Sequence, residues 1–434
     1  MNNKLHKYPA YKDSGAEWLG DIPEHWEVTK VKNVFRLVID ASPKNNDFEL
    51  LSVYTDIGVK PRKELEERGN KASTTDGYWL VKKGDIVVNK LLAWMGAIGV
   101  SNYDGVTSPA YDILRAKVQL ESNFYHYLFR NAACISELKK HSRGIMDMRL
   151  RLYFDKFGDI MIPFPDFSEQ QKIVSFLDRK TALIEQAIGI KEKQIELLKE
   201  RRQILIHRAV SRGLNLNVKL KESGVEWIGE IPEHWEVKKI KHVTTKIGSG
   251  VTPSGGGTTY LDSGIALLRS QNILFGKVEL EGVAYISEKT HASMSNSQVR
   301  KGDVLLNITG GSIGRCHFID FDIPLNVNQH VCIVRPSMLI TSIFLNSLLA
   351  SEVGQGQIWF FQQGGGREGL NFQAIKNFLI PLPPKLEQTE ISKYIETITL
   401  KFHTAISLKE QEIEKLKEYK ASLINEAVTG KIKV

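Results

Sequence analysis

The chain has 434 residues, of which 42% are hydrophobic and 25% are charged. This length and composition exclude a disordered or fibrous protein and favour two or more folded domains. Lysine and arginine outnumber aspartate and glutamate by 58 to 50, and the net charge of +8 favours a polyanionic partner. Three cysteines without a CxxC pair exclude a dense disulfide framework. We expect a cytoplasmic protein without a membrane partner, because the N-terminus lacks the features of a signal peptide and no apolar run approaches about 18 residues.

Two segments of the chain are nearly the same. Residues 12–34 and 221–243 are identical at 16 of 23 positions. Shorter matches follow in the same order: VKKGDIVVN at 81–89 with VRKGDVLLN at 299–307, GAIG at 96–99 with GSIG at 311–314, and IPFP at 162–165 with IPLP at 380–383. The sequence therefore predicts an internal repeat of two halves.

Each half begins with a variable part, at about 18–165 in the first half and 227–384 in the second. Short runs rich in Val, Ile and Tyr alternate there with Gly, Asn, Asp and Pro, which is typical of strands and turns. The second part also contains a Gly-rich stretch at 248–260. We predict that each variable part folds as a small α+β domain.

Each variable part is followed by a predicted long amphipathic helix, at about 168–211 and 386–429. Apolar residues recur in both at three- and four-residue spacing, which Lys191 and Lys409 interrupt at equivalent places. Since neither helix can bury its apolar stripe alone, we expect the two helices to pair with each other. Connectivity alone permits a parallel or an antiparallel pair.

Several fragments imitate catalytic motifs. Pro165, Asp166, Asp178 and Lys180 match the PD…DxK pattern of metal-dependent nucleases, but Asp178 and Lys180 fall inside a predicted helix instead of on a strand. The SPAY sequence at 108–111 matches only part of the loop with which amino-methyltransferases hold a flipped base, and no Gly-x-Gly turn precedes it. Residues 310–315 lack the GK[ST] of a phosphate-binding loop and are predicted to form a tight turn.

The histidines and cysteines also favour structural roles. His25 and His234 recur beside tryptophans in both repeated segments, which indicates packing in a shared frame. Cys316-His317 and His330-x-Cys332 do not have the spacing of a structural zinc site. We therefore predict no catalytic residue, no metal site and no cofactor in this chain.

The polar side chains of the variable parts suit a different role. Arginine, asparagine and glutamine make bidentate contacts with base edges, whereas lysine and arginine neutralise phosphates. The candidate DNA-binding residues are Lys60, Arg62, Lys63, Lys71, Lys90, Arg269, Gln271, Asn272, Arg315, Gln329, His330 and Arg367.

Several motifs occur in a fixed order along nearly the whole chain. They are the twin SG.EW.G.IPEHWEV segments, RSQNI at 269–273, and NQH at 328–330 followed by IVRP at 333–336. Glu169-Gln170 and Glu387-Gln388 also follow each IP.P before a long helix. With these motifs, the chain resembles the specificity subunit of type I restriction-modification systems. Residues 48–120 lack signals like TPS and RSQNI, so the first domain resembles a different recognition class.

The resemblance implies an α+β fold with two globular mixed α/β target-recognition domains, residues 1–166 and 213–384. An antiparallel coiled coil of two long helices, 167–212 and 385–434, would separate them in a pseudo-two-fold internal repeat. Such a subunit is not an enzyme. It reads a bipartite double-stranded DNA site for two methyltransferase subunits and for restriction/translocase subunits, which use S-adenosylmethionine and ATP/Mg to methylate adenine or cleave DNA.

Two other interpretations are compatible with a repeated, basic chain. A single-chain methyltransferase or nuclease would bind S-adenosylmethionine or a divalent metal by itself. A protein scaffold would use its helices to bind proteins and would not bind DNA through its variable domains. Salt-sensitive duplex binding by the reconstituted complex distinguishes a DNA reader from a scaffold.

Overall fold

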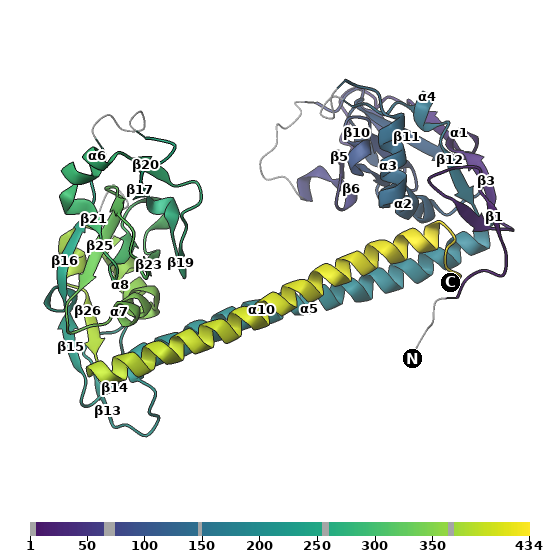
Figure 1. Ribbon diagram of the computed structural model, residues 1–434. Helices are drawn as coiled ribbons and strands as arrows, with labels where there is room; N and C mark the ends of the chain where they lie inside the picture. The colour runs from purple at the N-terminus through teal and green to yellow at the C-terminus, as the bar shows by residue number, and fades with distance from the viewer. Residues whose placement is uncertain (1–5, 65–73, 146–149, 254–259, 363–368) are drawn as a thin grey trace. The chain divides into compact units, whose positions relative to one another are not determined.

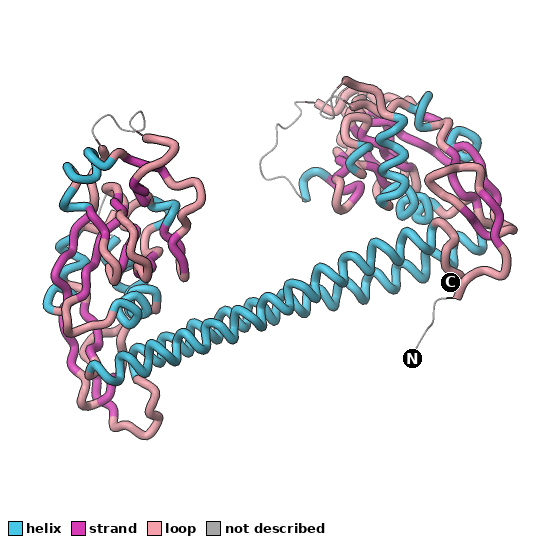
Figure 2. Tube along the Cα trace, in the orientation of Figure 1, coloured by secondary structure: helices cyan, strands magenta, loops and turns pink. Residues whose placement is uncertain are grey.

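The computed structural model describes residues 6–64, 74–145, 150–253, 260–362 and 369–434. These residues form two compact units, one of residues up to 192 together with 410–434, and one of residues 193–409. Each unit combines short strands and short helices with a segment of both long helices, α5 (Phe167–Arg212) and α10 (Lys385–Val428) (Figures 1 and 2). None of the described helices is both long and apolar enough to cross a membrane.

The first unit contains a small mixed α/β domain. Its strands are β1 (Tyr11–Asp13), β2 (Asp21–Pro23), β3 (Glu27–Lys30), β4 (Phe35–Val38), β5 (Leu51–Tyr54), β6 (Gly58–Pro61), β7 (Trp79–Val81), β8 (Ile86–Asn89), β9 (Ile98–Val100), β10 (Gly105–Thr107), β11 (Tyr111–Ala116) and β12 (Met161–Phe164). Its short helices are α1 (Val31–Val34), α2 (Ser122–Arg130), α3 (Ala132–His141) and α4 (Phe154–Phe157).

The second unit contains a domain of the same kind. Its strands are β13 (Leu220–Glu222), β14 (Glu230–Pro232), β15 (Glu236–Lys239), β16 (Thr244–Ser249), β17 (Ile265–Leu268), β18 (Ile273–Leu274), β19 (Lys277–Val278), β20 (Ala284–Ile286), β21 (Gln298–Val299), β22 (Val304–Asn307), β23 (Cys316–Phe318), β24 (Leu325–Val327), β25 (Val331–Pro336) and β26 (Leu379–Leu382). Its short helices are α6 (Glu288–Ser293), α7 (Ser342–Ala350), α8 (Glu352–Gln362) and α9 (Phe372–Lys376).

The two domains share one frame. An antiparallel sheet of order β4-β11-β8-β9 in the first unit corresponds to the sheet of order β16-β25-β22-β23 in the second. The pairs β1-β2 and β12-β3 likewise correspond to β13-β14 and β15-β26. The domains differ outside this frame, because the second has a four-stranded sheet β20-β17-β24-β21, in which β17 and β24 are parallel. The described part of the first domain has the strand pairs β5-β6 and β10-β7 instead.

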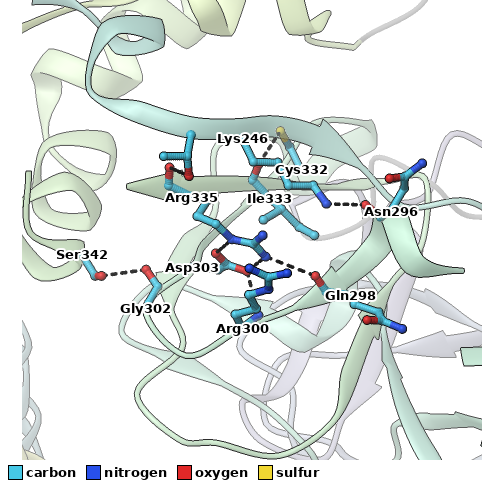
Figure 3. A network of polar contacts seen from close by, with 11 residues as sticks. Lys246, Asn296, Gln298, Arg300, Gly302, Asp303, Cys332, Ile333, Arg335 and Ser342 are labelled. Carbon is cyan, nitrogen blue, oxygen red and sulfur yellow. Dashed lines mark hydrogen bonds and ion pairs between the residues drawn. The ribbon is translucent and has the colours of Figure 1, made fainter. Parts of the chain in front are cut away.

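A buried ion pair recurs at the same place in both frames. In the second unit the guanidinium of Arg335, on β25, donates two hydrogen bonds to the carboxylate of Asp303 at 2.7 and 2.8 Å (Figure 3). In the first unit Arg115, on β11, binds Asp85 in the same way at 2.9 and 2.7 Å. Both aspartates are at most 3% exposed and also accept a backbone N–H from the turn that precedes the strand. The repeated KGD sequence therefore forms the link between turn and neighbouring strand in each half.

The two long helices pack against each other in opposite directions. In the first unit Glu185 on α5 pairs with Lys420 on α10, and Lys191 on α5 pairs with Glu412, each with an N–O distance of 2.5 Å. The partner's number falls as the number along α5 rises, so the helices are antiparallel. Lys191, which interrupts the apolar spacing of α5, therefore forms an ion pair with the facing helix. The predicted fold class, two mixed α/β domains with an antiparallel pair of long helices, is confirmed.

A buried glutamine joins each long helix to its own domain. The Gln388 amide accepts a hydrogen bond from the backbone N–H of Thr341 at 2.9 Å and donates to the carbonyls of Leu339 and Pro383 at 2.9 and 3.0 Å. Gln170 accepts from the N–H of Glu121 and donates to the carbonyl of Pro165, both at 2.8 Å. Both side chains are at most 1% exposed. The first turn of each helix is therefore bonded to the turn before a short domain helix.

The far end of each long helix packs on the repeated tryptophan of the other half. Gly213 and Gly430 follow α5 and α10 with φ of 72° and 73°, the left-handed conformation that glycine adopts most easily. A Cβ atom at Gly213 would lie 3.1 Å from the ring of Trp235, and one at Gly430 would lie 3.0 Å from the ring of Trp26. Both tryptophans are fully buried.

We predict that the substitution Gln388→Leu destabilises the second unit. Leucine has a similar volume, but the Thr341 N–H and two carbonyl oxygens lose their partner in a mostly buried site. Each unsatisfied buried group costs about 1–3 kcal/mol, so the free energy of unfolding should fall by about 2 kcal/mol or more. Urea unfolding measures this change, with Gln373→Leu at an exposed position of α9 as the control. Equal unfolding midpoints for the two variants would contradict the role of the buried amide.

Candidate nucleic-acid interface

In the second unit, several loops meet at one end of the two four-stranded sheets. The Asn307 side chain donates to the carbonyl of Ser270 at 2.7 Å, and the Asn328 backbone N–H donates to the carbonyl of Leu268 at 3.1 Å. The Ile308 N–H donates to the carbonyl of His330 at 3.0 Å. These bonds hold together residues 268–270, 307–308 and 328–330.

Four polar side chains form a continuous row in this loop cluster. The Thr252 hydroxyl donates to Gln329 Oε1 at 2.5 Å, and Gln329 Nε2 lies 2.9 Å from His330 Nε2. The other ring nitrogen of His330, Nδ1, lies 2.6 Å from Thr309 Oγ1. Gln329 is exposed, and His330 and Thr309 are half-buried. The structure therefore brings the two predicted residues Gln329 and His330 together with two threonines that sequence reasoning did not select.

The other predicted residues of the second domain have different surroundings. The Arg269 guanidinium lies 5.8 Å from the centre of the Tyr260 ring, and Gln271 is exposed on the 3-10 helix Ser270–Asn272. Arg315 is half-buried beside the Asn307 backbone, because its carbonyl accepts the Asn307 N–H at 2.9 Å. Arg367 lies outside the described residues.

Asn272 is placed inside the domain. It is 2% exposed, its Oδ1 accepts the Arg269 N–H at 3.0 Å, and its Nδ2 donates to the Glu279 carbonyl at 3.0 Å. Both ends of this amide therefore shape the turn before β18 and the hairpin that follows. A short sequence motif such as RSQNI does not show which of its polar side chains turns inward.

In the first domain, the predicted cations gather on one hairpin. Lys60 on β6 donates to the Tyr103 hydroxyl at 3.4 Å and lies 5.8 Å from the centre of its ring. Arg62 and Lys63 follow on the 3-10 helix Arg62–Glu64, where Lys63 pairs with Glu49. Lys71 lies outside the described residues. Three of the predicted cations are therefore neighbours.

Lys90 lies on a neighbouring loop and has close anionic and carbonyl partners. Its ammonium group is 3.1 Å from an oxygen of Asp112 and donates to the Pro109 carbonyl, also at 3.1 Å. The Lys90 side chain is 20% exposed. Burial raises the pKa of Asp112 above its usual range, and Lys90 opposes this shift. Lys90 thus neutralises a partly buried carboxylate within the domain.

The fragments that imitate a nuclease site lie far apart on one helix. Asp166 accepts the Glu169 N–H at 2.8 Å and caps the start of α5, whereas Asp178 accepts the Tyr127 hydroxyl at 2.6 Å. Asp178 lies twelve positions after Asp166, a distance of about 18 Å along the helix at 1.5 Å per residue. Their carboxylates cannot bind one metal ion, and the predicted helical setting of Asp178 and Lys180 is confirmed. Within the described ranges, no cluster of three histidine, cysteine or acidic residues is suited to a metal ion.

The other tempting motifs also have local structural roles. Residues 108–111 form a turn, in which the Tyr111 N–H donates to the Ser108 carbonyl at 2.9 Å. Residues 310–312 form the predicted tight turn as a 3-10 helix. Cys316 and Cys332 are buried, and burial raises the pKa of each thiol to about 12.

The two repeated histidines contact the glutamates that directly precede the buried glutamines Gln170 and Gln388. His25 Nε2 lies 2.9 Å from Glu169, and His234 Nε2 lies 2.7 Å from Glu387. Each contact connects the EHWE segment of one domain with the first turn of its long helix. Both histidines therefore make equivalent contacts in the shared frame.

Comparison with known proteins gives a consistent assignment. Residues 23–199 and 232–418 match the family model described as the type I restriction modification DNA specificity domain. The specificity subunit of the type I restriction enzyme MjaVIII from Methanocaldococcus jannaschii is 25% identical over 95% of this chain and 94% of its own. The EcoBI specificity subunit from Escherichia coli is 29% identical over 55% of this chain and 52% of its own.

Solved structures show the same fold. A chain from a study of complex assembly and conformational transition in a type I R-M system is 14% identical and superposes with a TM-score of 0.71, covering 94% of this chain and 98% of that one. The HsdS subunit from Thermoanaerobacter tengcongensis is 14% identical with a TM-score of 0.55, covering 95% of this chain and 98% of its own. Since the family model matches both halves of the repeat and covers most of the chain, this protein belongs to the type I restriction-modification DNA specificity family.

Proposed function

We propose that this chain is the non-catalytic, sequence-reading subunit of a cytoplasmic type I restriction-modification complex. Residues 1–166 and 213–384 would be two target-recognition domains, each binding one half of a bipartite double-stranded DNA site. The long helices, within 167–212 and 385–434, would connect them. Methyl transfer to adenine with S-adenosylmethionine, and cleavage driven by ATP/Mg, would belong to partner subunits.

The observation that supports this proposal most directly is that the two domains share one frame but differ in the structures beside it. Both domains keep the same four-stranded sheet and the same Asp–Arg pair, whereas the structures beside that sheet differ between them. The structures beside the sheet also carry side chains suited to DNA, Lys60 and Arg62 in the first domain and Arg269 and Gln329 in the second. Two different readers on one frame suit a site with two different halves.

The long helices offer a surface for the methyltransferase partners. In the first unit, Leu183 and Ile190 lie one heptad apart on α5 and are 55% and 51% exposed. In the second unit, Leu197 and Ile204 are again one heptad apart and are 52% and 57% exposed. These four residues lie off the seam that pairs α5 with α10. Exposed apolar residues at heptad spacing are typical of a helix face that binds further helices.

We expect Leu183→Ser with Ile190→Ser to weaken binding of the methyltransferase subunit by about tenfold or more. Removal of two buried apolar side chains from an interface loses about 1 kcal/mol or more for each, and 1.4 kcal/mol corresponds to tenfold in affinity. The same loss is expected for Leu197→Ser with Ile204→Ser. Titration of the purified partner measures this affinity.

Gln186→Ser with Gln194→Ser is the control, because both glutamines are exposed on α5 and their replacement by serine lowers helix propensity at least as much as the apolar changes do. Equal affinity for the control and the apolar variants would show that the partners do not bind this face.

We expect that replacement of residues 35–160 by the corresponding segment of another family member changes only one half of the DNA site. The exchanged segment runs from the start of β4 to the residue before β12, so the frame strands β3 and β12 stay. Methylome sequencing of cells that carry the chain and its methyltransferase partner reports both halves.

Salt-sensitive duplex binding by the reconstituted complex is the control for DNA binding as such, because phosphate contacts make affinity fall with salt. A change in both halves would contradict independent readers, and a wild-type complex without salt-sensitive binding would favour the scaffold interpretation.

A further inference from the structure

The exposed amide of Gln329 is bonded at both ends by its neighbours. Thr252 has a hydroxyl that donates to Gln329 Oε1 at 2.5 Å, and His330 Nε2 lies 2.9 Å from Gln329 Nε2. The loop of residues 328–330 is itself held in place. The His330 N–H donates to Asn328 Oδ1 at 3.1 Å, and the His330 carbonyl accepts a hydrogen bond from the Ile308 N–H. An exposed glutamine that is fixed at both ends has already lost the rotamer freedom that binding would otherwise remove.

The direction of each hydrogen bond in this row follows from the chemistry of the groups. A glutamine Nε2 group can only donate, so His330 Nε2 must accept and carries no proton. The proton of neutral His330 therefore sits on Nδ1 and is donated to Thr309 Oγ1 at 2.6 Å. Thr309 therefore provides a partner for the Nδ1–H tautomer of His330, and Thr252 and His330 provide partners for both ends of the Gln329 amide.

This arrangement leaves a defined pair of unused groups on Gln329. Oε1 has a second lone pair and Nε2 has a second N–H, and contacts among the described residues use neither. The free acceptor and donor of the Gln329 amide lie side by side, so they match a base edge that presents a donor beside an acceptor. In the major groove, adenine presents that pair through N6–H and N7, whereas guanine presents two acceptors.

We propose that Gln329 reads an adenine in the half-site of the second domain by a bidentate contact in the major groove. Oε1 accepts from adenine N6, and Nε2 donates to adenine N7. Thr252, His330 and Thr309 are positioning residues, because they bond both ends of the amide and so hold it in place. This inference rests on the proposed DNA-reading function and adds a base identity to one of its residues.

The repeat predicts that this readout belongs to one half-site only. Val331 pairs with Asn307 in the second frame, and Tyr111 pairs with Asn89 at the equivalent place in the first. Pro109 and Ala110 of the first domain are therefore equivalent to Gln329 and His330 of the second. The side chains of proline and alanine have no hydrogen-bonding group. The first domain must read its bases with other residues.

Gln329→Ala in the complete methyltransferase complex tests the assignment. Methylome sequencing should show that one A·T position in one half-site becomes degenerate, while all other positions stay fixed. Competition binding with duplexes altered at that position should show discrimination reduced by about tenfold or more, since a bidentate contact contributes about 1–3 kcal/mol. Gln373→Ala, at an exposed position of α9, is the matched control and should leave the site unchanged.

Thr252 provides a second test that leaves the reading side chain in place. Thr252→Val removes the hydroxyl that orients the amide and should reduce discrimination at the same position, whereas Thr252→Ser keeps the hydroxyl and should restore it. Binding to non-specific duplex should stay within about twofold in every variant, because no phosphate contact is removed.

Three outcomes would overturn the inference. The Gln329→Ala complex could recognise an unchanged DNA site, or it could lose discrimination at a G·C position instead of an A·T position. It could also bind all duplexes more weakly with a smaller salt slope, which would indicate a phosphate contact. Failure of the proposed function is distinguishable from all three, because the wild-type complex would then neither bind duplex DNA in a salt-sensitive way nor methylate a defined site.

Discussion

The structure depends on the joint between each long helix and its domain. Gln170 and Gln388 are buried, and each amide bonds backbone groups on both sides of the junction. Removal of such an amide leaves several backbone groups without partners in a mostly buried site, so the helix cannot change direction without losing them. The neighbouring glutamates reinforce the joint, since Glu169 and Glu387 bind the repeated histidines.

A fixed joint allows the rest of the domain to vary. The central sheet of each frame needs its apolar strands and the Asp–Arg pair, which join the turn before one strand to the next strand of the sheet. The structures beside that sheet differ between the halves, since the second domain has the sheet β20-β17-β24-β21 and the described part of the first has the pairs β5-β6 and β10-β7. Variation there changes the side chains offered to a ligand without disturbing the core, which is how loops on a rigid scaffold commonly carry specificity.

The sequence by itself determined the repeat, the two domains and both long helices. The predicted helices at 168–211 and 386–429 agree closely with Phe167–Arg212 and Lys385–Val428, because helical periodicity is a local property. The equivalent places of His25 and His234 in the repeat agree with their equivalent contacts to Glu169 and Glu387. The resemblance predicted the antiparallel pairing, which the ion pair between Lys191 and Glu412 now places in the structure.

The tertiary structure alone decided which polar side chains face outward and which assemble. Asn272 and Gln271 are adjacent in one motif, yet Asn272 turns inward to the Glu279 carbonyl while Gln271 stays exposed. Lys90, on the loop after β8, pairs with Asp112 on β11. Thr252 meets Gln329 across 77 positions of the chain. Such contacts depend on strand register and loop paths over long separations, which composition, periodicity and motif spacing do not encode.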